Sequence, residues 1–240
     1  GSTRIQRQLF SRTNGFLGFS YERDFLKIED DILEEESVLN IDHYNKANIF
    51  AGLSFDNSDS KFFPAKGLKL SSTGTLAGIG FDSDYHYYQL RLDGRKYQEI
   101  IDHLVIASRI MIGTMKPVWG DDHTPLEDRF YAGGANSIRG WRFSEIGSQS
   151  SENNAVGGNS YFESNLELRF PLWKIISGAL FLDLGNVWAN SYEYDFNDLH
   201  YSNGAGLRIK TPIGPIRFDI AKSINEQGNV QFYLSIGQAF

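Results

Sequence analysis

The sequence predicts an all-β protein, an antiparallel transmembrane β-barrel of about ten strands. Three observations support this fold class. The chain contains 24 Gly, 12 Tyr and 18 Phe but only 2 Met, a composition that suits pleated strands with two different faces. Apolar and polar residues alternate along several segments, and the connections between these segments alternate between short and long. No stretch approaches 18 consecutive apolar residues, which excludes a membrane-spanning helix but is compatible with barrel strands.

The clearest alternation lies at the C-terminal end of the chain. In segment 229–240 one face carries apolar residues, interrupted only by Gln238, and these are Val230, Phe232, Leu234, Ile236 and Phe240. The other face is mostly polar or small, with Gln231, Tyr233, Ser235, Gly237 and Ala239. Segment 213–223 repeats the pattern, with Ile216, Phe218 and Ile220 opposite Arg217 and Asp219. We expect two antiparallel strands joined by the turn-forming NEQGN.

Segment 158–171 carries several charged residues on its polar face. Alternation places Glu163, Glu167 and Arg169 together on one face, and a face with three charges cannot be a dry core. Alternation alone does not separate a soluble β-sandwich from a barrel with lipid outside and water inside, so the sandwich remains an alternative. Long strand-like runs, aromatic residues close to turns, and alternating connection lengths favour the barrel.

The expected strands cover most of the chain. They are residues 13–26, 46–57, 64–78, 84–97, 101–115, 158–171, 177–190, 199–211, 213–223 and 229–240. The acidic segment 27–40 has apolar residues near helical spacing, so it is either a short surface helix or a solvated charged loop. Residues 116–157 form a loop too long for a hairpin turn. Gly1 and Ser2 resemble a cloning remnant, so a single barrel domain is expected over 3–240.

Several function classes are excluded or disfavoured. The net charge is −7 and no basic stripe is present, so nucleic acid is not an expected partner. Cysteine is absent, which removes disulfides, thiolate metal sites and cysteine nucleophiles. The five histidines lack metal-binding spacing, and no nucleophile motif is found, so neither an enzyme nor a cofactor or metal is expected. Asp56 and Asp59 fit hydrogen bonding within a turn better than a calcium loop.

Residues 130–143, FYAGGANSIRGWRF, carry the most specific motif. They resemble the sixth extracellular loop of the BamA/TamA superfamily, which has a Val/Ile-Arg-Gly-Phe/Trp tetrad, here Ile138, Arg139, Gly140 and Trp141. Other segments resemble family elements in the same order: GNSYFESNLELRFP with GALFLDLGNVW, and LHYSNGAGLRIKTPIGPIRFDIA. The segment FDNSDSKFFPAKG resembles the family's Asp-rich periplasmic turn through Asp56, Asp59, Pro64 and Gly67. The resemblance covers roughly residues 46–240.

The resemblance implies that this loop folds back into the barrel. In the family the loop arginine pairs with acidic residues of the next two strands, which correspond here to Glu167 and Asp183. Alternation independently places both carboxylates on the polar face of their strands. A guanidinium presents a bidentate fork to a carboxylate, so Arg139 would act as a latch, meaning the side chain that fixes the loop to the barrel wall. Gly140 would allow close approach of the backbone. The alternative is that Arg139 is a solvated loop charge.

The function implied by the resemblance is insertion or translocation of proteins at the outer membrane of a Gram-negative bacterium. Client proteins would use a weak seam between the first and last strands. Gly237 could kink the last strand, which ends at Phe240. The alternative for Gly237 is a lumen position without room for a side chain. The expected partners are outer-membrane lipid and client outer-membrane or secreted proteins. Full-size family members have sixteen strands, so the chain is either a C-terminal part or a short barrel, for which a homodimer is one solution. A barrel anchor of a patatin-type phospholipase and a passive pore are the alternatives.

Overall fold

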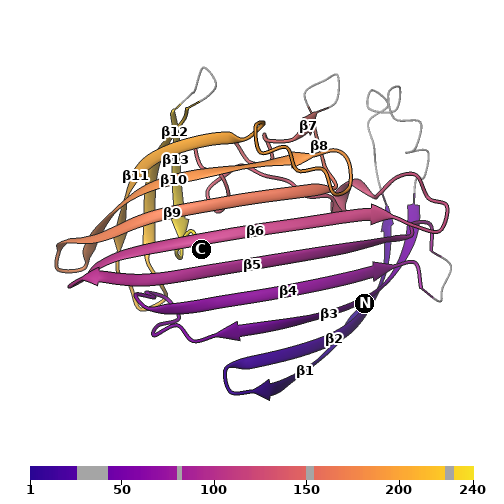
Figure 1. Ribbon diagram of the computed structural model, residues 1–240, viewed down its shortest axis with the longest axis horizontal. Coiled ribbons are helices and arrows are strands. Elements are labelled where there is room, and N and C mark those ends of the chain that lie inside the picture. The colour runs from indigo at the N-terminus through magenta and orange to yellow at the C-terminus, as the bar shows by residue number, and fades with distance from the viewer. Residues whose placement is uncertain (26–42, 80–82, 150–153, 225–229) are drawn as a thin grey trace.

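The computed structural model of the chain describes residues 1–25, 43–79, 83–149, 154–224 and 230–240. Its elements follow one another as a long meander (Figure 1). The strands of the main sheet are β1 (Ser2–Phe10), β2 (Thr13–Phe25), β3 (His43–Asp56), β4 (Gly67–Ala77), β5 (Tyr87–Ile101), β6 (Leu104–Pro117), β9 (Ser160–Trp173), β10 (Ile176–Trp188), β11 (His200–Ile209), β12 (Ile216–Ser223) and β13 (Val230–Ile236). A 3-10 helix, η2 (Leu126–Asp128), and the short strands β7 (Ser148–Gln149) and β8 (Ala155–Gly157) lie between β6 and β9.

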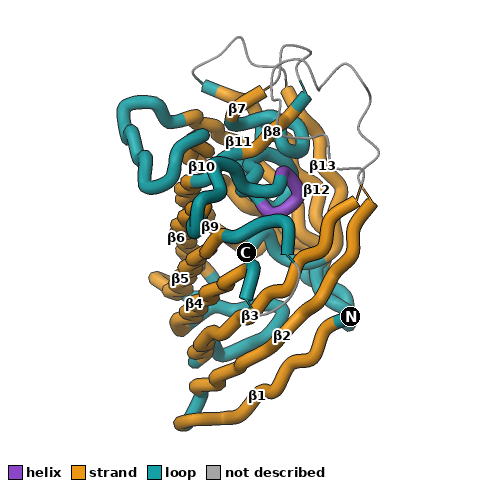
Figure 2. Tube along the Cα trace, turned by 90° about the vertical axis from the view of Figure 1, so that its right-hand side faces the viewer, coloured by secondary structure: helices purple, strands orange, loops and turns teal. Residues whose placement is uncertain are grey.

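The eleven strands form one antiparallel sheet in chain order, and β6 pairs directly with β9. The sheet curves around the connection between β6 and β9, residues 118–159, which we call the long loop (Figure 2). Among the described residues, β1 and β13 each have one hydrogen-bonded neighbour. The predicted fold class is confirmed, with eleven strands in place of ten, and the long loop begins and ends two residues later than expected.

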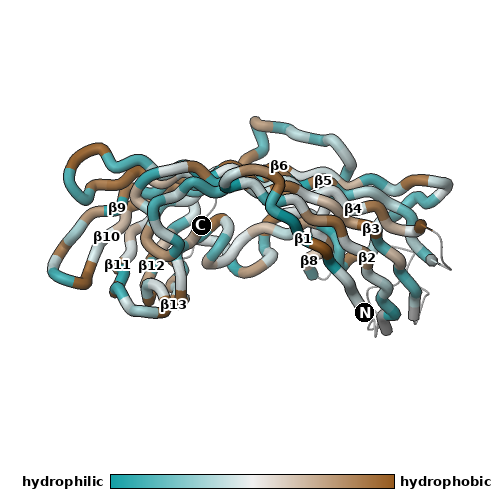
Figure 3. The backbone as a smooth tube through the Cα atoms, turned by 90° about the horizontal axis from the view of Figure 1, so that it is seen from below, coloured by the Kyte–Doolittle hydropathy of each residue, from teal (hydrophilic) through white to brown (hydrophobic). Residues whose placement is uncertain are grey.

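The two faces of the sheet differ in polarity. Apolar side chains are exposed on the convex face, among them Leu17, Leu53, Leu90, Ile110, Leu166, Leu180, Phe218, Phe232 and Leu234. Many charged residues lie on the concave face, among them Glu163, Glu167 and Asp183, which are fully buried. Hydrophobic and hydrophilic stretches alternate along the strands (Figure 3). A soluble sandwich would bury its apolar face and wet its polar face, so this inverted arrangement rules out the sandwich and fits a lipid-facing outer surface.

No helix in the described parts of the chain is long and apolar enough to cross a membrane.

The strand register accounts for which residues meet inside. Asp183 on β10 lies opposite Asn165 on β9 and Ser202 on β11, while the adjacent Leu182 lies opposite Leu166. Glu167 on β9 lies opposite Phe181. Because side chains alternate along a strand, this register puts the polar partners of three strands on the concave face and the leucines on the convex face.

The predicted alternation of short and long connections holds only in part, because 57–66 is longer than 78–86. Residues 11–12, 57–66, 102–103, 174–175 and 210–215 connect the strands at one end of the sheet. The connections at the other end include 189–199 and the described parts of 78–86 and of the long loop. The acidic segment 27–40 falls outside the described residues. At the short-turn end, Lys210 lies over the ring of Phe63 at 5.0 Å, so the turn 57–66 reaches from β3 and β4 to the connection between β11 and β12.

The C-terminal end corrects one expectation. Strand β13 stops at Ile236, Gly237 has a φ of +99°, and Phe240 is buried against Tyr97 and Ala107 inside the curve of the sheet (Figure 1). The prediction that Phe240 extends the apolar outer face is therefore wrong, because the positive φ of Gly237 breaks the alternation. A Cβ on Gly237 would meet nothing within 4 Å, so a lack of space does not explain this glycine.

The N-terminal end adds a strand that the alternation did not reveal. β1 begins at Ser2, and the amino group of Gly1 donates a hydrogen bond to the carbonyl oxygen of Tyr21 at 2.6 Å. In this strand Ile5 lies opposite Leu17 on the convex face, but Arg7 is on that face too. Because this face mixes apolar and charged residues, the strand has no clear hydrophobic period.

Candidate functional site

The candidate site is the tip of the long loop and the strand residues that hold it. Glycines let the loop turn back on itself: Gly133 and Gly134 have φ values of +107° and +99°. The N–H of Gly134 donates to the carbonyl oxygen of Trp141 at 3.1 Å, which closes the turn containing the tetrad Ile138–Trp141. Reciprocal backbone hydrogen bonds between Phe130 and Gly158 tie the start of this segment to the end of the long loop, just before β9. The sequence therefore folds this segment inward as a compact unit.

Arg139 is the centre of the site. Its Nε and Nη2 donate to the two carboxylate oxygens of Asp183 at 2.7 and 2.9 Å. Its Nη1 donates to Glu167 at 2.6 Å and to Asp219 at 3.3 Å, and all four side chains have no exposed surface. The guanidinium carbon lies 3.4 Å from the ring centroid of Phe181. The two residues expected to bind Arg139 do so, and Asp219 is a third carboxylate that the motif comparison missed.

The same carboxylates also form ion pairs with other arginines. Glu167 also accepts hydrogen bonds from Arg169 at 2.8 Å and Arg208 at 3.1 Å, and Asp219 also pairs with Arg208 and with Arg217. Buried charges are costly unless they are paired and hydrogen-bonded, so a network of this kind tolerates few changes. The site is therefore a shared charge network over β9 to β12 with the loop arginine inserted into it.

The neighbours of Arg139 in the tetrad fix its backbone. Gly140 has a φ of +92°, and a Cβ there would lie 3.0 Å from the backbone of Lys222 and Ser223. Only glycine combines this backbone conformation with this close approach. Ile138 is fully buried, and Trp141 is 6% exposed with its ring edge-on to His200 at 4.7 Å between centroids. The tetrad is thus held by packing as well as by charge.

Polar contacts hold the residues just before the tetrad. Ser137 donates to Glu163 at 2.6 Å, and Arg109 donates to Glu163 at 3.1 Å and to the carbonyl oxygen of Asn136 at 3.3 Å. Arg217 donates to the side-chain oxygen of Asn136 at 2.6 Å. Alternation had placed Glu163 and Arg217 on the polar face, but only the path of the loop shows what they bind.

A second anchor holds the start of the long loop to the other half of the sheet. Lys46 on β3 is buried and pairs with Asp128 of η2 at 2.6 Å and with Glu127 at 3.4 Å. Tyr87 on β5 donates to Asp128 at 2.5 Å, and Tyr44 donates to Glu127. The sequence carried no signal for this anchor, because η2 has no pattern that separates it from an ordinary turn. The long loop thus connects β3 and β5 with β9 to β12 across the concave side.

The Asp-rich turn is built from side-chain to backbone hydrogen bonds. Asp59 accepts from the N–H groups of Ala65 and Lys66 at 2.9 and 3.1 Å, and Asp56 accepts from the N–H of Ser58 at 2.9 Å. Burial raises the pKa of Asp59, but the backbone donors outweigh burial and hold this pKa below its usual value. Gly67 closes the turn with a φ of +115°. The aspartates therefore act as turn-forming residues, as predicted.

Pro64 completes this turn and is buried next to Ala65. In the described residues no group of three or more His, Cys, Asp or Glu side chains is placed to hold a metal ion.

Comparison with known proteins identifies the family. The Omp85 superfamily domain matches residues 1–240. The chain belongs to the Omp85 superfamily. An Omp85 chain with this fold is an outer-membrane β-barrel protein, as the resemblance to BamA and TamA had implied.

Two curated relatives show how much of an Omp85 protein is present. The chain is 27% identical over 237 residues to the outer membrane protein assembly factor BamA of Nitratidesulfovibrio vulgaris, covering 93% of this chain and 30% of that protein. It is 32% identical over 192 residues to the human sorting and assembly machinery component 50 homolog, covering 76% of this chain and 38% of that protein. The chain thus spans about a third of the length of these relatives.

A solved structure supports the fold. The crystal structure of BamA from Haemophilus ducreyi lacking POTRA domains 1–3 superposes with a TM-score of 0.82 at 22% identity. The match covers 98% of this chain and 53% of that chain. The eleven-stranded sheet therefore has the fold of a large part of that protein.

Proposed function

We propose that this chain assists insertion or translocation of proteins at the outer membrane, and that clients enter at a seam formed by β1 and β13. A relative is named an outer membrane protein assembly factor, and another a sorting and assembly machinery component. In the described structure β1 and β13 each pair on one side only. Free strand edges present unpaired N–H and C=O groups to which an extended client segment can add by β-augmentation.

The chemistry of such a step needs no cofactor. A client strand that pairs with a free edge satisfies its backbone hydrogen bonds, and its apolar side chains leave water for lipid. The outward residues of β13 offer an apolar surface for a client strand, since Phe232, Leu234 and Ile236 are each about 70% exposed. Lipid and unfolded client barrels are therefore the proposed partners.

In this proposal Arg139 is the latch that keeps the sheet in its curved form while the edges open. The observation that carries it is the complete burial of Arg139 among Asp183, Glu167 and Asp219, because one loop residue then joins three strands, of which β12 pairs with β13. A loop charge in solvent would do nothing to the sheet. A buried one resists any movement that separates its partners.

Reconstitution tests the proposal. The purified chain would be placed in liposomes, an unfolded outer-membrane barrel would be added, and the folded client would be measured by protease protection and by gel mobility without heating. We expect faster folding than in empty liposomes, and slower folding with Arg139→Ala. Folding at the rate of empty liposomes would contradict the proposal.

Cysteine pairs test the seam separately, because the chain has no cysteine of its own. One cysteine would be placed in β1 and one in β13. Oxidised pairs within one chain are expected to block client folding, and reduction is expected to restore it. Crosslinks that form only between two chains would show a dimer and would contradict a seam within one chain.

A further inference from the structure

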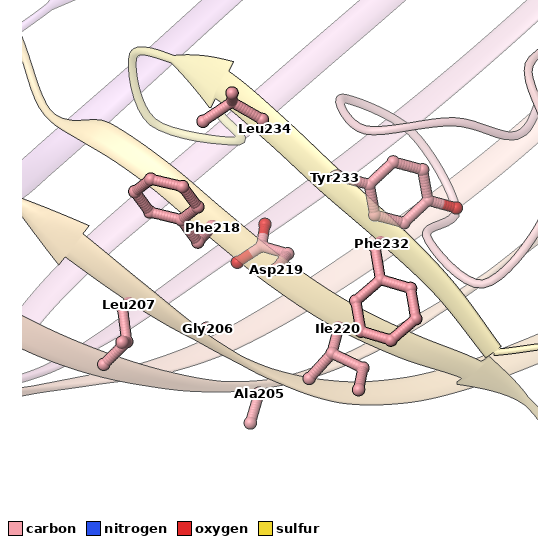
Figure 4. A pocket seen from close by; sticks show the side chains of 9 residues that line it. All are labelled: Ala205, Gly206, Leu207, Phe218, Asp219, Ile220, Phe232, Tyr233 and Leu234. Atoms are coloured by element: carbon pink, nitrogen blue, oxygen red, sulfur yellow. The ribbon is translucent and has the colours of Figure 1, made fainter.

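Tyr233 is the one residue of β13 that reaches the loop tetrad. It lies between Phe232 and Leu234, whose side chains face outward in the apolar groove over β11 to β13, and its ring extends to the other side of the strand (Figure 4). Its hydroxyl accepts a hydrogen bond from the N–H of Gly140 at 2.9 Å. The same hydroxyl donates to the carbonyl oxygen of Trp141 at 2.7 Å. Both partners are backbone groups within the tetrad.

These two hydrogen bonds extend the contacts of the loop by one strand. Arg139 binds carboxylates on β9, β10 and β12, and Gly140 lies against β11 and β12. Tyr233 adds β13, so the tetrad contacts every strand from β9 to the edge of the sheet. The other inward side chains of β13, Gln231 and Ser235, have no side-chain hydrogen bond within the described part of the chain.

We propose that Tyr233 is a positioning residue through which docking of the long loop controls the mobility of β13. β13 is a seven-residue strand with one neighbour in the described sheet, so few interactions hold it. A hydroxyl that satisfies both a backbone donor and a backbone acceptor of the tetrad links the position of the strand to that of the loop. When the tetrad is docked, β13 is held; when it undocks, β13 is released.

The inference rests on the proposed function, since β13 is one side of the proposed seam. The inferred link between the buried charge network and β13 is the hydroxyl of Tyr233. A role for Tyr233 in packing alone would depend on its ring and not on its hydroxyl, so Tyr233→Phe separates the two roles. Ser235→Ala is the matched control, because it removes a hydroxyl from the same inward face of the same strand without removing a bond to the loop.

Amide hydrogen exchange without any client is the test. In Tyr233→Phe we expect about tenfold faster exchange at Gly140 and along β13, while Ser235→Ala leaves both unchanged. We also expect Arg139→Lys to speed exchange in β13 when Tyr233 is present and to have no further effect in the Tyr233→Phe background. This loss of effect is the signature of coupling, which independent structural contributions would not produce.

Two results would overturn the inference. If Tyr233→Phe speeds exchange at Gly140 but leaves β13 unchanged, the hydroxyl serves only the loop. If Arg139→Lys speeds exchange in β13 equally with and without the hydroxyl, the loop acts on the strand by another path. Neither readout involves client folding, so failure of the proposed insertase function would leave the coupling intact and would be seen only in the liposome assay.

Discussion

Asp183 receives two side-chain hydrogen bonds from Arg139, one on each carboxylate oxygen, at 2.7 and 2.9 Å. The backbone N–H of Arg139 also donates to Asp183 at 3.2 Å. This side-by-side geometry uses the planar fork of a guanidinium, which a lysine ammonium cannot reproduce. Asp183 therefore recognises both the side chain and the backbone position of Arg139, and this makes the pair more specific than the shared contact with Glu167.

Gly140→Ala is expected to displace the tetrad. The added Cβ would lie 3.0 Å from the backbone of β12, and the φ of +92° is unfavourable for alanine. Gly120→Ala is the matched control, because Gly120 has a φ of +102° with nothing within 4 Å of the added Cβ. Limited proteolysis of the long loop should accelerate strongly in the first variant and little in the second. Equal effects would show that the backbone strain, and not the close approach, matters at Gly140.

Lys46→Met is expected to release the start of the long loop. Lys46 is buried and its partners Glu127 and Asp128 are partly exposed. We therefore expect the free energy of unfolding to fall by an amount on the order of 2 kcal/mol, between the values for buried and surface ion pairs. Lys66→Met is the control, since it breaks the ion pair of the exposed Lys66 with Glu99 and should lower the free energy of unfolding much less than Lys46→Met does. Urea unfolding in detergent micelles measures both. A silent Lys46→Met would mean that this anchor contributes nothing.

Leu166→Arg tests the lipid-facing surface. Leu166 lies midway along β9 on the convex face and is 47% exposed. A cation at the middle of the membrane on the lipid face of a barrel costs about 2–4 kcal/mol. Thr75→Arg on the concave face of β4 should have an effect within about 0.5 kcal/mol. Stability measured in lipid bilayers distinguishes the two faces, and equal costs would contradict the assignment of the convex face to lipid.

The Asp-rich turn is expected to loosen in acid. The pKa of Asp59 is lower in the folded chain than in the unfolded chain, so its contribution to stability is present above the unfolded pKa of about 3.9 and is lost as the pH falls through the folded pKa. Hydrogen exchange at Ala65 and Lys66 should therefore accelerate, relative to other turns, only below about pH 4. Asp59→Asn should abolish this pH dependence. An unchanged acid profile in that variant would contradict the role of the carboxylate.

Strand faces were predictable wherever a strand alternates cleanly. The inward orientation of Glu167, Asp183 and Asp219 follows from period-two counting alone, because each sits between outward apolar residues. The same counting put Tyr233 on the inner face. It failed at Phe240, because β13 ends at Ile236 and the positive φ of Gly237 breaks the alternation.

The partners of these inward residues were less predictable. Asp219 and Tyr233 bind the tetrad only because the long loop crosses the concave side, and that path depends on tertiary contacts such as those of Lys46 with η2. A loop without a regular period carries no local signal for its route. The family motif identified Arg139 and two of its partners, whereas the third carboxylate and the second anchor required the structure.

The central claim is that Arg139 is an inward latch bound to Asp183, and a double-mutant cycle with Arg139→Gln and Asp183→Asn tests it most directly. Each single change leaves a buried group without its partner and should cost about 3–5 kcal/mol in unfolding experiments in detergent or lipid. The double variant should cost less than the sum, with a coupling of about 1–3 kcal/mol. Additive effects within about 0.5 kcal/mol, or single variants that are each nearly silent, would show that the latch is absent.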